Sequence, residues 1–203
     1  LVAAASTMAS LTAIADSQDT HPANAARTGA SQIGSDTGSQ TPLPADAPLP
    51  SDRAPVEQIG FEDVTYWDEL RRILDWSQSH VRRTFTLCWG AMAALHHFHA
   101  VPKHPLAEKA SGVFAHDNLA PASAWMRGLP DVFDVPVSRW SEVRAADLPV
   151  GRGLAVLAQS AESGVCLIDD PAHRAVHMLN HLEYDTLTLA HEYARDAGAR
   201  GIH

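Results

Sequence analysis

Cysteine, aromatic residues and long apolar runs are all scarce in this sequence of 203 residues. The two cysteines, Cys88 and Cys166, are too few for the disulfide framework of a small secreted protein, and they lack the short spacings of zinc and redox motifs. The longest apolar run, from Leu87 to Leu95, is far short of the roughly 20 residues that cross a bilayer. We therefore expect no transmembrane helix, no membrane partner and a reducing, cytoplasmic setting.

Positive charge is also in short supply. The chain carries 15 Lys and Arg side chains against 24 Asp and Glu, for a formal net charge of −9, and it contains no run of basic residues. A chain of this charge repels a phosphate backbone, so we do not expect a nucleic-acid partner.

The first 53 residues differ in composition from the rest. They hold 12 Ala, 7 Ser, 6 Thr and 5 Pro, and the first aromatic residue of the chain is Phe61. Such a segment buries too little apolar surface to offset its conformational entropy. We predict a low-complexity, disordered or irregular arm over 1–53 and a folded domain over 54–203. Residues 1–15 are apolar enough for a short helix, but they lack the basic start of a secretory signal.

From residue 54 onward, strand-like and helix-like runs alternate. This pattern is typical of an α/β domain in which helices flank a mostly parallel sheet. We expect helices over 66–79, from Cys88 to the proline at 102, and over 185–197. The expected strands are short apolar runs bounded by Gly, Pro or polar residues, at 83–88, 131–137, 154–158, 165–168 and 175–179.

Cys88 stands at the end of a strand-like run and directly before a helix. This is the position of the nucleophile in hydrolase-type strand-turn-helix elbows, and Gly90 allows the close backbone approach that such a turn needs. Backbone N–H groups and the helix dipole at that point are expected to lower the thiol pKa and to stabilise an oxyanion. The alternative is a small, buried, structural cysteine.

His181 and Glu183 follow directly on the last apolar run. The imidazole could accept the thiol proton, and the carboxylate two residues later could orient the ring and stabilise its charged form. Together with Cys88 they would form a thiol triad. The alternative is an ordinary surface loop, since the chain has 12 histidines and most of them must be structural.

We expect no metal site. The closely spaced His96, His97 and His99 face different ways on a helix, and no neighbouring carboxylate or cysteine completes a ligand set. These three histidines are interpreted as structural, as are His104, His116, His173, His177 and His191.

The segment 54–196 resembles the homoserine O-acyltransferase family of methionine biosynthesis. The resemblance lies in the motifs APVE (54–57), FEDVTYWDEL (61–70), CWGA (88–91), EK (108–109), GVF (112–114), SR (138–139) and EYDTL (183–187). It implies a class I glutamine-amidotransferase-like fold with an incomplete N-terminal lobe. It also implies transfer of an acyl group from coenzyme A through a cysteine to the γ-hydroxyl of L-homoserine, with no permanently bound cofactor and a possible homodimer.

The resemblance also assigns residues. Cys88 would be the nucleophile, His181 the base and Glu183 its partner, while Arg195 would bind the homoserine carboxylate and Lys109 and Ser138 would line the substrate pocket. From the residues alone, Arg195 and Lys109 would be solvated surface charges.

Glu57 is the residue that indicates which acyl donor the protein uses. In the family that we find similar, a carboxylate at this position goes with acetyl donors and a glycine with succinyl donors. A glutamate would fill space and repel the distal carboxylate of a succinyl group. We therefore expect acetyl-CoA as co-substrate, with succinyl-CoA as the alternative.

The stretch before Ala54 lacks the apolar strand that the resemblance implies, because prolines at 42, 44, 48 and 50 cannot donate to a central ladder. One strand of the sheet is then expected to be an exposed edge. The stretch is either a shifted reading frame or a genuine truncation. Two other functions stay open: a glutamine-amidotransferase-like hydrolase, and a catalytically silent remnant or partner subunit.

Overall fold

The structure is a computed structural model, and it describes residues 11–14 and 56–200. The predicted arm over 1–53 therefore lies outside the described residues, except for 11–14. Within the described ranges, no helix is both long and apolar enough to span a lipid bilayer.

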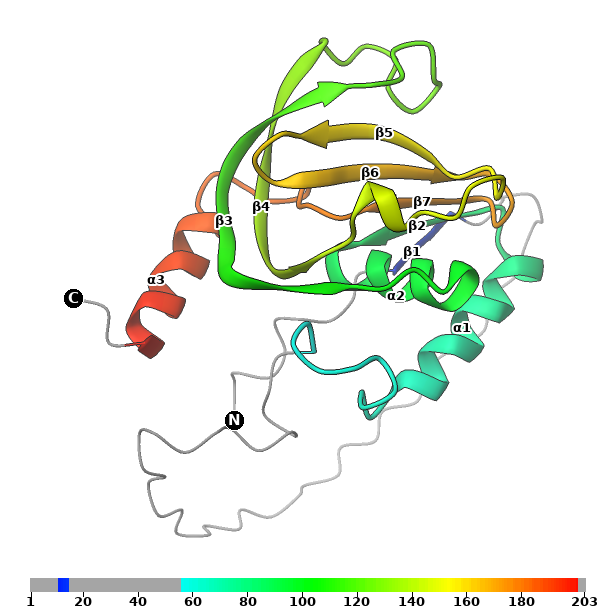
Figure 1. Ribbon diagram of the computed structural model, residues 1–203, viewed down its shortest axis with the longest axis horizontal. Coiled ribbons are helices and arrows are strands. Elements are labelled where there is room, and N and C mark those ends of the chain that lie inside the picture. The colour runs from blue at the N-terminus through cyan, green and yellow to red at the C-terminus, as the bar shows by residue number, and fades with distance from the viewer. Residues whose placement is uncertain (1–10, 15–55, 201–203) are drawn as a thin grey trace, which may run out of the picture.

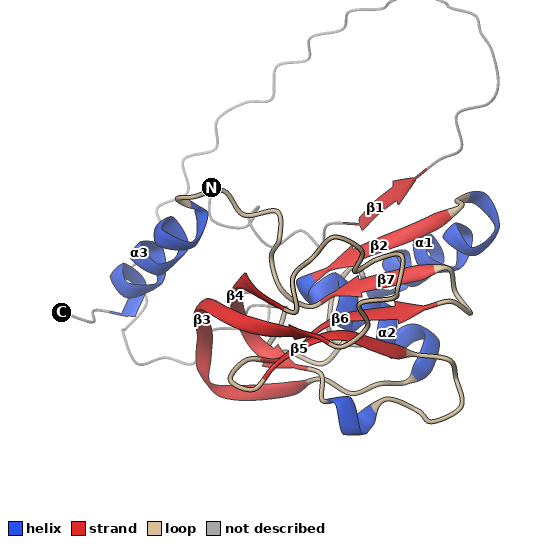
Figure 2. Cartoon of the chain, turned by 90° about the horizontal axis from the view of Figure 1, so that it is seen from above, coloured by secondary structure: helices blue, strands red, loops and turns tan. Residues whose placement is uncertain are grey.

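One sheet runs through the described part of the chain, with helices beside it (Figure 1, Figure 2). Its strands are ordered β1-β2-β7-β6-β5-β3-β4. In chain order their bounds are β1 Leu11–Ile14, β2 Arg83–Leu87, β3 His104–Asn118, β4 Val132–Glu142, β5 Ala155–Ser160, β6 Gly164–Asp170 and β7 Ala175–Met178.

The α/β class is confirmed, but the pairing differs from the expected mostly parallel sheet. Within the described strands, only β2 and β7 pair in parallel, and every other pair is antiparallel. The cause is the length of the connections. Three residues join β5 to β6 and four join β6 to β7, and such short turns allow only antiparallel neighbours.

Two helices, α1 (Trp67–His80) and α2 (Cys88–His99), lie together beside the β2, β7 and β6 part of the sheet (Figure 2). The third, α3 (Thr188–Arg200), lies next to β3 and β4. A single 3₁₀ turn, η1, spans Ala145–Asp147. The helices predicted over 66–79 and from Cys88 are confirmed to within a residue or two, and the last one begins three residues later than predicted.

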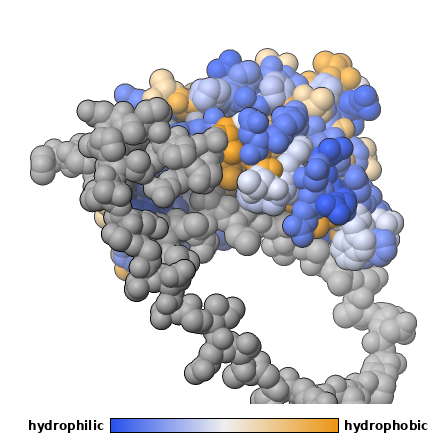
Figure 3. Space-filling view, turned by 90° about the horizontal axis from the view of Figure 1, so that it is seen from below, coloured by the Kyte–Doolittle hydropathy of each residue, from blue (hydrophilic) through white to orange (hydrophobic). Residues whose placement is uncertain are grey.

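The apolar spacing of α1 explains its position. Trp67, Leu74 and Ser77 are buried on one side, while Asp68 and Glu69 occupy the first turn, where negative charge favours the helix dipole. Most of the outer side chains are exposed and polar, although Ile73 and Trp76 are also exposed. The described surface seen from below is likewise mainly hydrophilic, with smaller apolar areas between polar side chains (Figure 3).

In contrast, α2 is apolar along most of its length, and its residues from Trp89 to Leu95 are all buried. It ends at Ala100, which adopts the left-handed conformation (φ 55°) and donates its N–H to His96 O. Pro102 follows two residues later, as in many helix C-termini.

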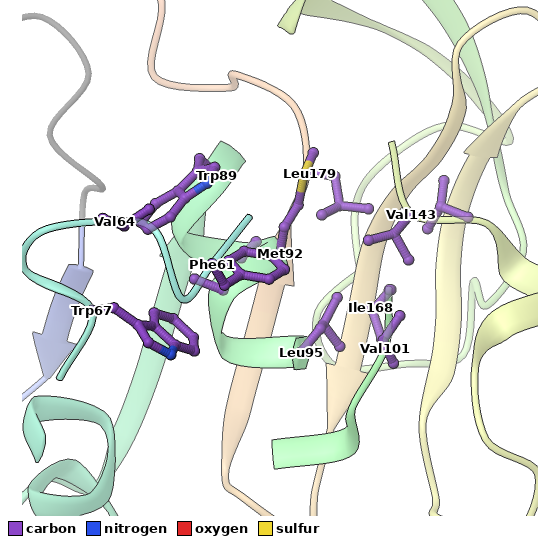
Figure 4. Packing of buried hydrophobic residues seen from close by; sticks show 13 residues of the cluster. Phe61, Val64, Trp67, Trp89, Met92, Leu95, Val101, Val143, Ile168 and Leu179 are labelled. Atoms are coloured by element: carbon purple, nitrogen blue, oxygen red, sulfur yellow. The ribbon is translucent and has the colours of Figure 1, made fainter. Parts of the chain in front are cut away.

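The core beneath these helices joins several segments (Figure 4). Phe61 stacks on Trp67, with ring centroids 5.3 Å apart, and Met92 and Leu95 of α2 belong to the same cluster, in which Leu95 lies next to Ile168 of β6. Each of these α2 side chains is fully buried. Truncation of one such side chain to alanine typically costs about 2–5 kcal/mol.

The long strand β3 was missed by the sequence analysis. It has no strict alternation of apolar and polar residues, and most of it is only partly buried. It is held by pairing with β4 along nearly its whole length, and Figure 1 shows both strands curving around one end of the sheet. Pro136 is tolerated in β4 because this strand is the edge of the described sheet.

The prediction of a helix within residues 1–15 is wrong for 11–14. These four residues form β1, which pairs antiparallel with β2 from Leu11↔Thr86 to Ile14↔Arg83. Leu-Thr-Ala-Ile contains two β-branched residues, which favour a strand once a partner is present. The expected exposed edge is therefore covered at β2.

Candidate active site

The turn between β2 and α2 has the geometry of a nucleophile elbow. Leu87 ends the strand in an extended conformation and Cys88 begins the helix with φ 48°. A positive φ at a non-glycine residue is strained, and such strain is common at catalytic positions. Because β2 and β7 run in parallel with Leu87 opposite Met178, the chain that leaves β7 toward His181 starts beside Cys88.

A buried carboxylate faces the thiol. The Cys88 Sγ donates to Glu57 Oε1 at 3.6 Å, and Glu57 Oε2 accepts the backbone N–H of Trp140 at 2.7 Å. Glu57 is only 6% exposed. Its own backbone is fixed by Lys103, whose ammonium donates to Glu57 O at 2.5 Å and to Ile59 O at 2.6 Å.

The expected lowering of the thiol pKa is wrong for this state. Burial and the negative charge of Glu57 raise the pKa of Cys88 far above its ordinary value. The Trp89 backbone N–H at the helix start does lower it, as expected, but this effect is outweighed. The elbow therefore holds a protonated thiol that donates its hydrogen to Glu57.

The His181 ring is positioned by Glu183 and by its own backbone. Its Nδ1 lies 2.7 Å from Glu183 Oε1, its backbone N–H donates to Pro136 O at 3.0 Å, and its ring stacks on Tyr184 with centroids 4.3 Å apart. Burial raises the pKa of Glu183, but the hydrogen bond with His181, a backbone hydrogen bond and the electrostatic interaction with His181 together outweigh it, so the pKa is lowered. The carboxylate is thus charged at neutral pH and leaves His181 Nε2 as the free nitrogen.

Cys88 and His181 both follow the carboxyl ends of the parallel strands β2 and β7, but no hydrogen bond joins them in the described structure. Among the hydrogen bonds of the described residues, the thiol donates to Glu57 and none joins it to His181. Tyr184, whose ring stacks on His181, has the pKa of its phenol raised by burial and by the negative charge of Glu192.

The three residues that the resemblance assigns to the substrate converge on two carboxylates of α3. Ser138 donates its hydroxyl to Glu192, and Lys109 Nζ lies 2.5 Å from Asp196 Oδ2. Arg195 Nε donates to Asp196 Oδ1 at 3.0 Å. The α3 carboxylates thus neutralise the cationic groups that were predicted to bind the substrate.

Several residues of this site were missed by the sequence analysis: Tyr184, Glu192, Asp196, Trp140 and Arg139. Arg139 is buried and donates to Asn180 Oδ1 at 3.0 Å and to Ser163 O, close enough to Cys88 to affect the thiol pKa. An arginine so little exposed could not be inferred from its neighbours in the sequence. Glu192 stands three residues before Arg195, and that spacing on one helix face was the available signal.

Comparison with known proteins gives one family and close relatives. The family model described as homoserine O-succinyltransferase matches residues 53–202. A homoserine O-acetyltransferase from Novosphingobium aromaticivorans is 76% identical over 145 residues, which are 71% of this chain and 48% of that protein. One from Rhizorhabdus wittichii is 62% identical over 143 residues, covering 70% and 45%. The chain spans about half the length of the curated relatives it matches.

Among solved structures, a glutamine amidotransferase from Thermotoga maritima superimposes with a TM-score of 0.56. The two are 12% identical, and the match covers 71% of this chain and 62% of that one. This likeness confirms the glutamine-amidotransferase-like fold that the sequence resemblance implied.

Proposed function

This chain belongs to the homoserine O-succinyltransferase family, and we propose that it carries the nucleophile and the base of an acyltransferase that acts on L-homoserine in methionine biosynthesis. The observation that carries the proposal is the position of Cys88. It stands with positive φ at the carboxyl end of β2, beside the parallel strand that leads to the paired His181 and Glu183.

The proposed reaction has two half-reactions. In the first, the Cys88 thiol leaves Glu57 and gives its proton to His181 Nε2, and the thiolate attacks the thioester carbonyl of acyl-CoA. A new S–C bond forms, the bond from the acyl carbon to the CoA sulfur breaks, and His181 returns the proton so that CoA departs as a thiol. In the second, His181 takes the proton of the homoserine γ-hydroxyl. The alkoxide oxygen attacks the acyl-cysteine carbonyl, the S–C bond breaks to release the O-acyl product, and the Cys88 thiolate takes the proton back from His181.

Glu57 supports acetyl as the acyl group. Its side chain is fixed by Trp140 and lies 3.6 Å from the sulfur to which the acyl group would be attached. An acetyl group has no distal charge that this carboxylate would repel. The distal carboxylate of a succinyl group would meet a buried negative charge, which costs several kcal/mol. We therefore propose acetyl-CoA as the donor.

Lys109, Ser138 and Arg195 support a carboxylate-bearing acceptor. They gather a hydroxyl, an ammonium and a guanidinium around carboxylate oxygens of α3, and the carboxylate of homoserine has the same chemistry. In this proposal it competes with Glu192 and Asp196 for these groups. A planar guanidinium binds a carboxylate through two parallel hydrogen bonds.

The test is mass spectrometry of the intact chain after incubation with acetyl-CoA or succinyl-CoA. We expect an acetyl adduct that maps to Cys88, is absent in Cys88→Ala and is lost from the wild-type chain on addition of L-homoserine. Cys166→Ala is the matched control, since Cys166 is the other free cysteine and lies buried in β6; this variant should keep the adduct.

Each outcome separates the parts of the proposal. A succinyl adduct formed faster than the acetyl adduct would overturn the donor assignment and leave the nucleophile in place. Labelling that persists in Cys88→Ala, or no labelling from either donor, would overturn the assignment of the nucleophile.

A further inference from the structure

The far end of α2 carries a second cluster of side chains, which has no part in the proposed transfer. His99 is the last residue of α2, Asp170 the last of β6, His173 lies in the β6–β7 turn and His177 in β7. Since α2 rises about 1.5 Å per residue, His99 lies about 16 Å along the helix from Cys88.

Three imidazoles point at one oxygen of Asp170. Its Oδ2 lies 2.6 Å from His99 Nε2, 2.8 Å from His173 Nδ1 and 3.6 Å from His177 Nε2. Its Oδ1 accepts the backbone N–H of His173 at 3.3 Å, which fixes the carboxylate. The nearest ligand atoms of His99, Asp170 and His173 all lie within 4.8 Å of one another.

Hydrogen bonding does not account for the whole cluster. His177 is fully buried and its Nε2 has no hydrogen-bond partner, although it is aimed at Asp170. Its Nδ1 lies 2.8 Å from the Thr86 hydroxyl. When Nδ1 carries the proton and donates it to Thr86, the Nε2 lone pair faces the carboxylate oxygen, so two acceptors oppose each other. A cation between them would satisfy both.

We propose that His99, Asp170, His173 and His177 form a binding site for a divalent transition metal of the zinc class. Three imidazole nitrogens and one carboxylate oxygen are a set that zinc accepts in tetrahedral geometry, with ligand atoms about 3.3 Å apart. The three measured separations from Asp170 Oδ2 differ from that value by less than 1 Å. The ligand atoms of His99, Asp170 and His173 already lie within 4.8 Å of one another, whereas His177 stands outside this group and has to move closer to complete the set.

Burial and charge also suit a cation. The Asp170 and His177 side chains are fully buried and His99 is 1% exposed, while His173 is 26% exposed and leaves a path from solvent. The Asp170 carboxylate supplies a buried oxygen ligand of the kind that a divalent cation binds.

The site would join three segments. It connects the end of α2 to the β6–β7 turn and to β7, and so holds the helix that presents Cys88 against the strand that leads to His181. This is a positioning role, since none of the four side chains contacts Cys88 or His181 by a hydrogen bond in the described structure.

The test is titration of the full chain, purified without a polyhistidine tag and stripped with a chelator, with Co²⁺ followed by visible absorption. We expect one Co²⁺ per chain with the intense d–d bands of tetrahedral coordination, displaced by Zn²⁺. His173→Gln should weaken Co²⁺ binding at least roughly tenfold, the lower end of what loss of a supporting group costs a metal site. His97→Gln is the matched control, because His97 lies on the same helix but pairs with Asp75.

Stoichiometric Co²⁺ binding that is unchanged in His173→Gln would overturn the proposal, as would the absence of stoichiometric binding to the wild-type chain. X-ray absorption of the zinc-loaded wild-type chain tests the site without any variant. Imidazole ligands with one oxygen support the proposal, and sulfur ligation or fewer than two imidazoles contradicts it. None of these measurements depends on the acyltransferase proposal.

Discussion

The two ends of helix α2 place a buried carboxylate in opposite settings. At its start, Glu57 faces a thiol and helps to raise the pKa of Cys88. At its end, burial raises the pKa of Asp170, but interactions with His177, His99 and His173 outweigh it and hold that pKa well below the ordinary range. The same functional group therefore suppresses ionisation of a neighbour at one end and is itself held ionised at the other.

The difference shows that partner chemistry, more than burial, decides what a buried acid does. Glu57 receives one thiol and one amide N–H. Asp170 is approached by three imidazoles, each of which can hold or release a proton or bind a cation. The Cys88 end of α2 is therefore suited to a single proton-transfer step, whereas the His99 end is suited to stabilising the fold.

The largest expected effect comes from removal of the carboxylate at the His99 end. Asp170→Ala leaves buried imidazoles without their acceptor, so we expect a loss of about 3–5 kcal/mol in the free energy of unfolding. Urea denaturation at pH 7 in the presence of a chelator measures it. Asp75→Ala removes the partner of the neighbouring His97 but at an exposed position, and it should cost less than about 1 kcal/mol. If both variants lost the same free energy of unfolding, the buried setting of Asp170 would not differ in effect from the exposed setting of Asp75.

At the Cys88 end, removal of charge should raise reactivity. Glu57→Gln deletes the negative charge beside the thiol, so the pKa of Cys88 should fall toward its ordinary value while burial still holds it up. Alkylation by iodoacetamide at pH 8 should become faster, about tenfold for each pKa unit recovered. Mass spectrometry of the Cys88 peptide gives the rate. In Glu62→Gln, an exposed acid that pairs with His96, the rate should not change; a slower rate in Glu57→Gln would contradict the assigned direction.

Lowering the pH should destabilise the interactions at the His99 end of α2 before it affects those at the Cys88 end. Burial lowers the pKa of His177 in the folded chain, whereas the unfolded value is about 6.5. Between these two pKa values, His177 is protonated in the unfolded state and neutral in the folded state. The stabilisation is therefore complete above pH 6.5 and is lost as the pH falls toward the folded pKa, with a slope of up to about 1.4 kcal/mol per pH unit.

Unfolding of the metal-free chain in urea at pH 7 and at pH 5.5 tests this linkage. His177→Gln should reduce the slope, while the exposed His80→Gln should retain it. A chain that is more stable at pH 5.5 than at pH 7 would reverse the sign. Histidines at the cluster would then be gaining protons on folding.

The smallest expected effect concerns backbone strain, which both ends of α2 share. Cys88 and Ala100 have φ values of 48° and 55°, but only Ala100 is free of a proposed chemical role. Ala100→Gly should stabilise the chain by up to about 1 kcal/mol, because glycine adopts this conformation without a Cβ clash. Ala115→Gly, at an exposed position in β3, should instead destabilise by roughly 0.5–1 kcal/mol. Thermal melts of both variants measure the difference in sign.

Elements that depend on neighbouring residues could be predicted from the sequence, whereas elements that depend on residues far apart in the chain could not. The helix stripe of Trp67, Leu74 and Ser77 and the small residues after Cys88 are local patterns, and both helices were predicted. The strand β3 depends on pairing with β4, and β1 on pairing with β2, so neither could be predicted from its own residues. The antiparallel pairing around β6 was missed because the order of strands is set by the whole fold.

The same reasoning applies to the candidate site. The contact between His181 and Glu183 needs only two residues of separation, and it could be predicted. The direction of the thiol pKa could not, because Glu57 stands 31 residues before Cys88. The cluster around Asp170 was missed for the same reason: its carboxylate and His99 are 71 residues apart, so the histidines of α2 alone lacked a complete ligand set.

The single parallel pair of strands has a consequence for how the chain folds. Thr86 and His177, which join β2 to β7, are separated by 91 residues, and the hairpins of β3 to β6 lie between them in the chain. Contacts of such high contact order pay a large loop-closure entropy and tend to form slowly. The chain should therefore acquire its hairpins early and bring Cys88 and His181 to one edge only in its slowest phase, so that recovery of thiol acylation lags behind recovery of secondary structure during refolding.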